Sequence, residues 1–225
     1  MDLIVHESRA EQAEAVAVAV AEELIAAVAA RGAAAVAVPG GSSPGAFLAA
    51  LAAAPVDWDA VTVMATDERW VAPEDGRSNE GMIRKAMAAA PIRFLPFWRE
   101  GATAAEAARA ASDEVAAVAP LTSVVLGMGA DMHCASLFPG GEGLADGLDP
   151  SCASFALPIA APGAPEPRIT LTLPALAGAG SVRLLISGEE KREALDRALT
   201  ATDPLAAPVS AVLRRARRVE AHWAP

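Results

Sequence analysis

Apolar residues follow two different spacings along the chain. In several segments they recur every three to four positions, as on one face of an amphipathic helix. The longest such segment runs from Ser8 to Ala30 and is followed by Gly32, a typical helix-ending residue. Elsewhere, short runs of consecutive apolar residues are typical of strands covered on both faces of a sheet. The predicted helices span residues 8–30, 44–54, 79–89, 103–118, 189–199 and 209–216. The predicted strands span residues 33–38, 61–65, 92–97, 123–126, 155–159, 168–173, 182–187 and 218–223, of which 168–173 alternates like a half-buried or edge strand.

The alternation of strands and helices predicts an α/β fold with a mainly parallel central sheet flanked by helices. No internal repeat or linker interrupts the chain, so residues 1–225 are expected to form a single domain. In open sheets of this kind, ligands bind beyond the carboxyl ends of the strands. Four polar clusters directly follow predicted strands and are expected to converge on one site: residues 40–44, 67–69, 127–133 and 188–191.

The composition narrows the class of protein. The 225 residues are 53% hydrophobic and 20% charged, which excludes a disordered chain. The formal net charge of −10 argues against nucleic acid or an anionic membrane as a partner. No apolar run approaches the roughly 20 residues of a membrane-spanning helix, and the start lacks a signal-peptide layout. Cys134 and Cys152 are too few for a disulfide framework or a zinc quartet. We therefore expect a cytoplasmic monomer that acts on a small molecule.

A loop of small residues leads into the second predicted helix. Gly40, Gly41, Ser42 and Ser43 let the backbone approach a ligand closely. Ser43 is the predicted N-cap and Pro44 the first helical residue. Free amides at a helix start favour an anion such as phosphate. An ordinary turn between strand and helix is the alternative, and the Gly-Lys-Ser/Thr of a nucleotide-binding P-loop does not follow.

Two further clusters place charges at strand ends. Asp67 and Arg69 follow the strand 61–65. Arg69 is suited to hold a phosphate or carboxylate through two hydrogen bonds, and Asp67 to orient substrate hydroxyls, unless this triplet is only a solvated loop. Lys191 is expected in the first turn of its helix, where the helix dipole disfavours a cation unless an anion binds beside it. The basic residues between 214 and 218 are interpreted as a solvated face.

The sharpest pattern is GMGADMH, residues 127–133, in which a strand leads into a glycine-rich bend and then into Asp131 and His133. An unperturbed imidazole titrates near pH 6.5, and a histidine beside a carboxylate is suited to act as a general base. A structural loop histidine is the alternative. The glycines do not form a dinucleotide fingerprint, because Met132 stands at the third glycine position. The acid and the histidine lack a second ligand cluster, so no metal is expected.

The order of these motifs resembles one protein family. PGGSSP, TDERWV, SNEGMI, LGMGADMHCASLFP, PRITLT and GEEK occur in this order between residues 36 and 199 and together are similar to the 6-phosphogluconolactonases, whose superfamily includes the glucosamine-6-phosphate deaminases. The resemblance implies a Rossmann-like α/β fold, no cofactor, and hydrolysis of 6-phosphoglucono-δ-lactone in the oxidative pentose phosphate pathway. It implies that His133 is the catalytic base and that Asp131 and Asp67 line the site. It places around the substrate and its phosphate the loop Gly40–Ser43, Arg69, Arg168 and Lys191.

The expected chemistry is the activation of water rather than a covalent intermediate. His133 would take the proton from water, and the backbone amides of Gly127 and Gly129 are candidate donors to the oxyanion. Asp131 or Asp67 would orient the imidazole, and the sequence does not decide between them.

Two positions depart from the commoner family motif DGHTASLFP. Met132 replaces glycine, and a residue with a Cβ is strained if the backbone has a positive φ there. Cys134 replaces threonine, which removes a hydroxyl donor and introduces an alternative nucleophile.

Two rival functions are weighed against lactone hydrolysis. The deaminases carry a motif like DGHIAFNEP, with a glutamate just before the proline, where this chain has Phe138. Phenylalanine cannot carry a proton for ring opening, which favours the lactonase. A non-catalytic sugar-phosphate sensor would need a DNA-binding segment, and the chain offers no spare basic domain.

Overall fold

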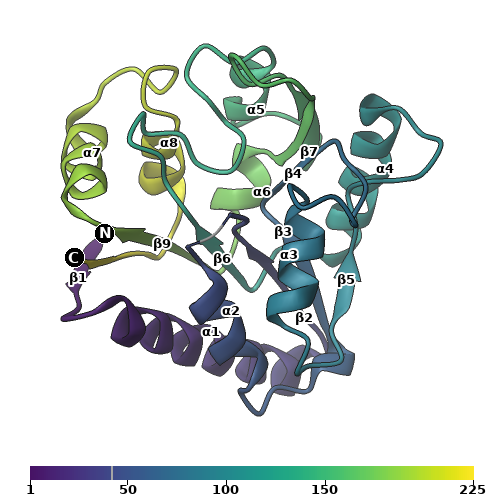
Figure 1. Ribbon diagram of the computed structural model, residues 1–225, viewed down its shortest axis with the longest axis vertical. Helices are drawn as coiled ribbons and strands as arrows, with labels where there is room; N and C mark the ends of the chain where they lie inside the picture. The colour runs from purple at the N-terminus through teal and green to yellow at the C-terminus, as the bar shows by residue number, and fades with distance from the viewer. Residues whose placement is uncertain (42) are drawn as a thin grey trace.

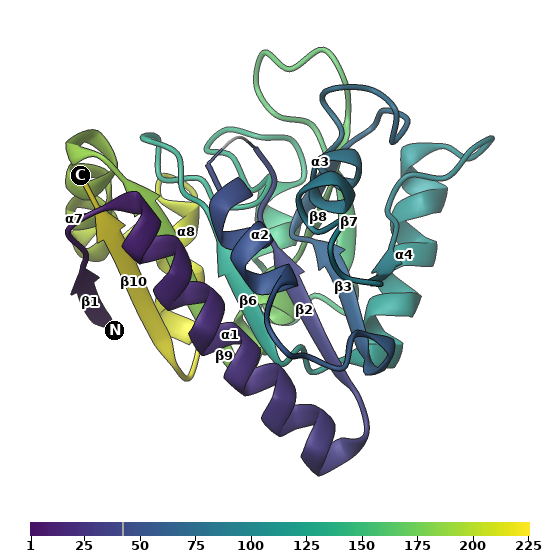
Figure 2. The same cartoon turned by 60° about the horizontal axis from the view of Figure 1, so that its bottom comes forward.

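The structure, a computed structural model, describes residues 1–41 and 43–225. Its centre is a seven-stranded sheet whose neighbouring strands are all parallel, in the order β1-β10-β9-β6-β2-β3-β5 (Figures 1 and 2). The expected α/β fold with a mainly parallel central sheet is confirmed. Its strands are β1 (Asp2–Val5), β2 (Ala34–Val38), β3 (Val61–Ala65), β5 (Arg93–Leu95), β6 (Ser123–Leu126), β9 (Ser181–Ser187) and β10 (Val219–Ala224).

Helices cover both faces of this sheet. One face carries α1 (Arg9–Arg31), α2 (Gly45–Ala52) and α3 (Asn79–Ala86), and Figure 2 shows the first two in front of the strands. The other carries α4 (Ala104–Val118), α6 (Leu173–Ala177), α7 (Glu189–Thr200) and α8 (Pro208–Arg215). A short 3-10 helix (Trp58–Ala60) precedes β3, and α5 (Leu144–Leu148) lies in the long connection after β6.

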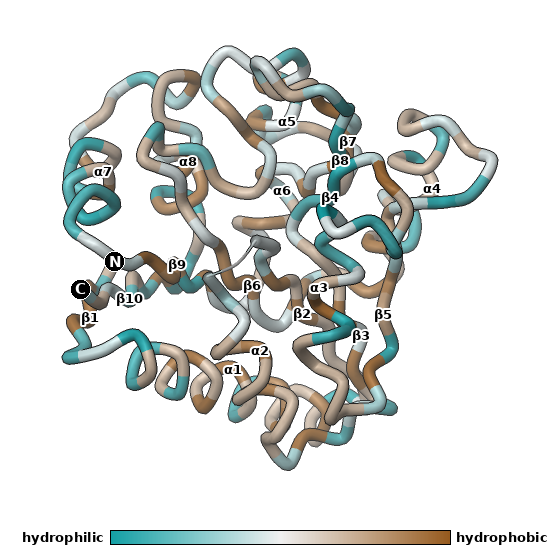
Figure 3. Tube along the Cα trace, in the orientation of Figure 1, coloured by the Kyte–Doolittle hydropathy of each residue, from teal (hydrophilic) through white to brown (hydrophobic). Residues whose placement is uncertain are grey.

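The alternation along β2 explains why its sequence is apolar without interruption. Val36 and Val38 belong to the hydrophobic cluster under α1, α2 and α3, whereas Ala35 and Ala37 belong to the cluster on the opposite face. Figure 3 shows hydrophobic residues along β9 and β6 and a largely hydrophilic α7 at the surface. No helix in the described part of the chain is long and apolar enough to cross a membrane.

The strand order has a switch point between β2 and β6. From β2 the chain proceeds outward through β3 and β5, and it then returns to β6 and proceeds in the opposite direction through β9 and β10. The loops after β2 and β6 therefore leave neighbouring strands at the carboxyl end of the sheet. Such a switch point is where open α/β sheets bind ligands.

A smaller antiparallel sheet stands beside the first and excludes two alternatives that the sequence left open. Its order is β4 (Asp67–Arg69), β8 (Arg168–Leu171) and β7 (Ala156–Ile159). Residues 67–69 are therefore a strand, which excludes the alternative of a solvated loop, and 168–171 form the central strand of this sheet, which excludes the edge position of the two readings given for this segment. Three charged residues are too few to show a strand period. The register places Arg69 directly opposite Arg168.

Other differences from the prediction involve short elements. Strand β1 and helices α5 and α6 were not predicted, because four or five residues do not show a helical or strand period. Ser43 is not the N-cap of α2. Pro44 takes that position, because its carbonyl accepts the first helical hydrogen bond, from the amide of Leu48. Ser78 is the N-cap of α3, and its side chain accepts from the amide of Gly81.

Two buried histidines join the ends of the chain. His6 follows β1 and His222 lies in β10, the neighbouring strand. Their rings stack, with centroids 5.3 Å apart, and Nε2 of His6 lies 3.0 Å from Nδ1 of His222. Burial, together with the adjacent His6, lowers the pKa of His222 to about 4.

This histidine makes stability fall in mild acid. An imidazole in the unfolded chain titrates near pH 6.5, so below that pH the unfolded chain binds a proton that folded His222 does not bind. The free energy of unfolding is expected to fall by roughly 1–2 kcal/mol between pH 6.5 and 5, and to be fully retained above pH 6.5. Urea unfolding at a series of pH values measures it, with the variant His222→Gln as the comparison.

Between pH 6.5 and 5, the free energy of unfolding of the His222→Gln variant should fall less than that of the wild type. Glu23 and Glu220 have pKa values below the usual 4.5, so their titration falls at lower pH and does not obscure the test. Equal slopes for the two proteins would contradict the assignment.

Candidate active site

A cavity of about 400 Å³ lies at the switch point, beyond the carboxyl ends of β2, β3, β6 and β9. Ten of the residues predicted from the sequence to form the site line it: Gly40, Gly41, Ser43, Asp67, Arg69, Gly127, Gly129, His133, Arg168 and Lys191. Asp131 reaches the cavity through its contact with His133. Ser42 lies outside the described residues. The structure thus brings all four polar clusters to one cavity.

His133 is held by Asp131. The Nδ1 atom of the imidazole lies 2.5 Å from Oδ1 of Asp131, and the same oxygen accepts from the backbone amide of His133 at 3.3 Å. Because Nδ1 is engaged with a carboxylate, Nε2 is the nitrogen left for proton transfer. The imidazole is hydrogen-bonded to Asp131, and Asp67 makes its hydrogen bonds to other residues.

The bend before His133 depends on a glycine and on a strained residue. A Cβ on Gly129 would lie 2.3 Å from the imidazole and 2.4 Å from Oδ1 of Asp131, so only glycine fits. Met132 has φ 66°, in the left-handed region that favours glycine. The amide of Gly129 donates to the carbonyl of His133 at 3.1 Å. This corrects the expectation that Gly129 offers a free amide to an oxyanion, and leaves Gly127 as the candidate.

Asp67 fixes the segment that follows His133. Its carboxylate is buried and accepts from Oγ of Ser136 at 2.5 Å and from Oγ1 of Thr66 at 3.2 Å. Cys134 lies in the same segment with its side chain fully buried. Burial, with Asp67 nearby, raises the pKa of this thiol to about 12. The thiol is therefore protonated at neutral pH, which makes it a poor nucleophile.

Three cations also line the cavity. Arg69 and Arg168 face each other in the small sheet, and Nη1 of Arg69 donates to the carbonyl of Arg77. Burial lowers the pKa of Arg168, and the neighbouring charge of Arg69 adds to this effect. The Nε atoms of both arginines are buried without a partner among the residues that the structure describes. Lys191 lies in the first turn of α7. Such a group of half-buried cations favours an anionic ligand.

Asn79 lines the cavity and was missed by the sequence analysis. Its Nδ2 donates to the carbonyl of Asp67 at 2.7 Å, and a Cβ on Gly40 would lie 1.9 Å from its Oδ1. The buried carboxylate of Glu68 accepts from the amides of Asn79 and Glu80, each at 2.7 Å, and so holds the start of α3 against β4. Burial raises the pKa of Glu68 despite these bonds. No spacing in the sequence links residue 79 to residue 40.

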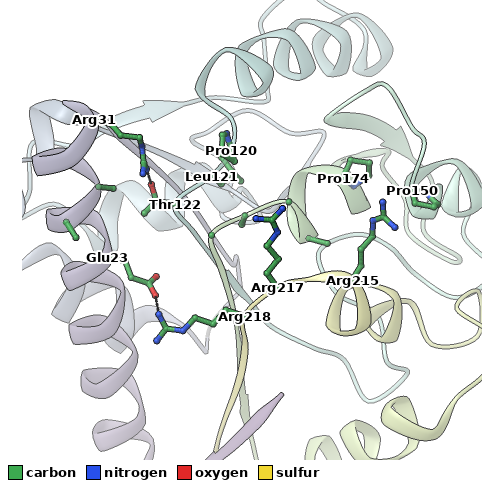
Figure 4. Close-up of a pocket in the computed structure, with 16 residues that line it drawn as sticks. Glu23, Arg31, Pro120, Leu121, Thr122, Pro150, Pro174, Arg215, Arg217 and Arg218 are labelled. Carbon is green, nitrogen blue, oxygen red and sulfur yellow. Dashed lines mark hydrogen bonds and ion pairs between the residues drawn. The ribbon is translucent and has the colours of Figure 1, made fainter.

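A larger cavity, of about 1000 Å³, lies at the amino ends of β6, β9 and β10 (Figure 4). Arg31 and Arg215 lie in the last turns of α1 and α8, where a cation complements the helix dipole. Arg218 pairs with Glu23 at 3.1 Å. These interactions account for Arg31, Arg215 and Arg218, and none of the predicted site residues lies there. Within residues 1–41 and 43–225, no group of three or more His, Cys, Asp or Glu residues is arranged to hold a metal ion.

Comparison with known proteins places the chain in a family. The profile of the glucosamine-6-phosphate isomerases/6-phosphogluconolactonase family matches residues 7–223, and the chain belongs to this family. Within it, the chain is 44% identical over 218 residues to the 6-phosphogluconolactonase of Rhizobium meliloti, covering 95% of this chain and 94% of that protein. It is 40% identical over 222 residues to the 6-phosphogluconolactonase of Pseudomonas aeruginosa, covering 97% and 92%.

Solved structures that share the fold of this chain carry the same family name as the sequence relatives. The crystal structure of a 6-phosphogluconolactonase from Shewanella baltica superposes with a TM-score of 0.91 at 29% identity, covering 100% of this chain and 98% of that one. A putative 6-phosphogluconolactonase from Neisseria gonorrhoeae gives a TM-score of 0.89 at 32% identity, with both chains fully covered. The resemblance noted from the motifs is therefore confirmed at the level of the family and the fold.

Proposed function

We propose that this chain hydrolyses 6-phospho-D-glucono-1,5-lactone to 6-phosphogluconate. The observation that carries the proposal is the pair of Asp131 and His133 at the edge of a cavity that also holds Arg69, Arg168 and Lys191. The pair supplies a general base, and the cations supply a site for the phosphate of the substrate. The relatives named 6-phosphogluconolactonase support this assignment.

The proposed reaction needs no covalent intermediate, because a lactone carbonyl is already electrophilic. Neutral His133 takes a proton through Nε2 from a water molecule as its oxygen attacks C1. The amide of Gly127, a residue that lines the cavity, is the proposed donor to the oxyanion that forms. When the C1–O5 bond breaks, the imidazolium returns the proton to O5. Asp131 accepts from Nδ1–H throughout, which keeps the tautomer and stabilises the imidazolium.

The sister activity in the family can be tested directly. Phe138 stacks on His133, with ring centroids 4.0 Å apart, where a deaminase of the family would carry a carboxylate. We expect the enzyme to hydrolyse the phosphorylated lactone above the spontaneous rate and to release no ammonia from glucosamine 6-phosphate. Parallel assays of acid production and ammonia release measure this. Ammonia release at a rate comparable to lactone hydrolysis would overturn the proposal.

Lys191 is expected to bind the phosphate of the substrate. A charge-assisted contact to a dianion contributes about 1.5–3 kcal/mol. Lys191→Ala should therefore raise KM roughly ten-fold or more, with a smaller effect on kcat. Unphosphorylated gluconolactone should be a poor substrate of the wild type. Steady-state kinetics with both lactones measure these effects.

The chain provides a matched control, since Lys85 is its other lysine. Lys85 is exposed on α3 and does not line the cavity. Lys85→Ala should leave KM unchanged. Equal kcat/KM of the wild type for the phosphorylated and plain lactones would remove Lys191, Arg69 and Arg168 from phosphate recognition.

A further inference from the structure

Phe138 contacts both His133 and Arg168, two residues of the proposed site. Its ring stacks on the imidazole of His133, with centroids 4.0 Å apart and an angle of 28° between the planes. The guanidinium carbon of Arg168 lies 5.3 Å from the centroid of the same ring. One side chain therefore touches the proposed base and one of the proposed phosphate ligands.

The backbone that carries this ring is tied to the core on both sides. The amide of Phe138 donates to the carbonyl of Ser136 at 3.1 Å, and its carbonyl accepts from Gly141 at 2.9 Å. Leu137 is completely buried, and the hydroxyl of Ser136 is bonded to buried Asp67. A Cβ on Gly141 would lie 3.0 Å from the carbonyl oxygen of Phe138, so this close turn favours glycine. The segment that carries the Phe138 ring is therefore held in place by backbone hydrogen bonds and by buried neighbours.

We propose that Phe138 is a positioning residue for the reaction, holding His133 and Arg168 at a fixed separation so that the base meets C1 while the phosphate is bound. The proposal rests on the function proposed above. Asp131 holds the imidazole at Nδ1, and a single hydrogen bond at one edge does not by itself fix the tilt of the ring plane. Stacking on Phe138 restricts the plane of the ring. The cation–π contact restricts the Arg168 guanidinium, which has a buried Nε without a partner among the described residues.

Loss of the Phe138 ring is expected to change kcat through His133 and KM through Arg168. Loss of the ring should let the imidazole move, and a displaced base lowers kcat by roughly ten-fold or more. Loss of the cation–π contact should raise KM by about two- to five-fold through Arg168. Phe138→Leu removes the ring and keeps an apolar side chain, whereas Phe138→Tyr keeps the ring. We expect the leucine variant to show both effects and the tyrosine variant to restore most of kcat and KM.

A matched control is available elsewhere in the chain. Phe94, on β5, is also half-buried and also has an arginine, Arg84, over its ring, at 4.9 Å. It does not line the cavity. Phe94→Leu should leave kcat and KM unchanged, which separates the loss of a cation–π pair in general from the loss of this one.

Double variants show whether Phe138 acts through its two partners. In a background of Arg168→Gln, Phe138→Leu should no longer raise KM. In a background of His133→Asn, it should no longer lower the residual kcat. Effects that persist unchanged in both backgrounds would show that Phe138 acts in some other way and would overturn the proposal.

The outcomes distinguish this proposal from the function on which it rests. If the wild type hydrolyses the lactone but Phe138→Leu matches it in kcat and KM, only the role of Phe138 is wrong. A tyrosine variant as impaired as the leucine variant, with both folded by circular dichroism, also overturns it. If the wild type does not hydrolyse the lactone, both proposals fall.

Discussion

Replacing His133 with asparagine should lower kcat for the lactone by about 10²–10⁴-fold, the usual loss when a general base is removed. Asparagine is similar in size and polarity but cannot take a proton from water. The cations that line the cavity remain, so the variant should bind 6-phosphogluconate about as well as the wild type. Lactone hydrolysis corrected for the spontaneous rate gives kcat, and calorimetric titration with the product gives the dissociation constant.

Two neighbouring variants serve as comparisons for His133. Asp131→Asn should also lower kcat, because an amide does not hold the imidazole in the tautomer that frees Nε2. Cys134→Ser should keep activity, because the buried thiol stays protonated and water attacks. A His133→Asn variant with nearly full kcat, or an acyl intermediate trapped on Cys134, would show the mechanism to be wrong.

Arg183→Ala should be strongly destabilising, with a loss of about 3–5 kcal/mol in the free energy of unfolding. The side chain of Arg183 is 1% exposed, and its guanidinium donates to Glu23 twice at 2.8 Å and to Glu220 at 2.9 Å. It also donates to the hydroxyls of Ser123 and Ser181. Burial by itself would raise the pKa of Glu23, and the hydrogen bonds from Arg183 and Ser181 outweigh it and lower that pKa. Removing the arginine leaves these carboxylates without their main partner.

Arg218 is the matched control, because it pairs with the same two carboxylates from the surface. Its side chain is 59% exposed, with contacts of 3.1 Å to Glu23 and 3.0 Å to Glu220. Exposed ion pairs contribute about 0–1 kcal/mol, so Arg218→Ala should change the free energy of unfolding by no more than that. Urea unfolding of both variants at pH 7 gives the comparison. A loss for Arg183→Ala no larger than that for Arg218→Ala would contradict this account of the network.

Much of the main sheet could be predicted because its elements are long or continuously apolar. The helix now seen at Arg9–Arg31 has more than six turns in which to show its period, and β2, β3 and β6 are buried on both faces. The short elements carry no such signal. Strand β4 is the clearest case, since Asp67 and Glu68 are buried carboxylates. Several of their donors, namely Ser136 and the amides at the start of α3, lie 10 or more residues away in sequence, and a local pattern cannot reveal them.

Most residues of the candidate site could be predicted from the sequence, but the contacts between them could not. Polar residues directly after apolar strands meet at one end of a parallel sheet, so the four clusters could be identified without coordinates. Which carboxylate holds His133 could not, because Asp67 and Asp131 are equally plausible until the loop is folded. The role of the Gly129 amide depends on a bend around Met132 that has a positive φ. The contact between Phe138 and Arg168 joins residues 30 positions apart and left no trace in the spacing.

The two sheets carry different parts of the proposed site, with Lys191 as the cation that follows a strand of the large sheet. The Asp131–His133 pair follows β6 of the large sheet, whereas Arg69 and Arg168 stand opposite each other on the small one. Substitution of Asp131 or His133 would therefore change the proposed proton transfer and leave the two arginines of the small sheet in place. A fold organised in this way is open to evolutionary change in one unit at a time. The occurrence of isomerases and lactonases in a single family is what such an arrangement would produce.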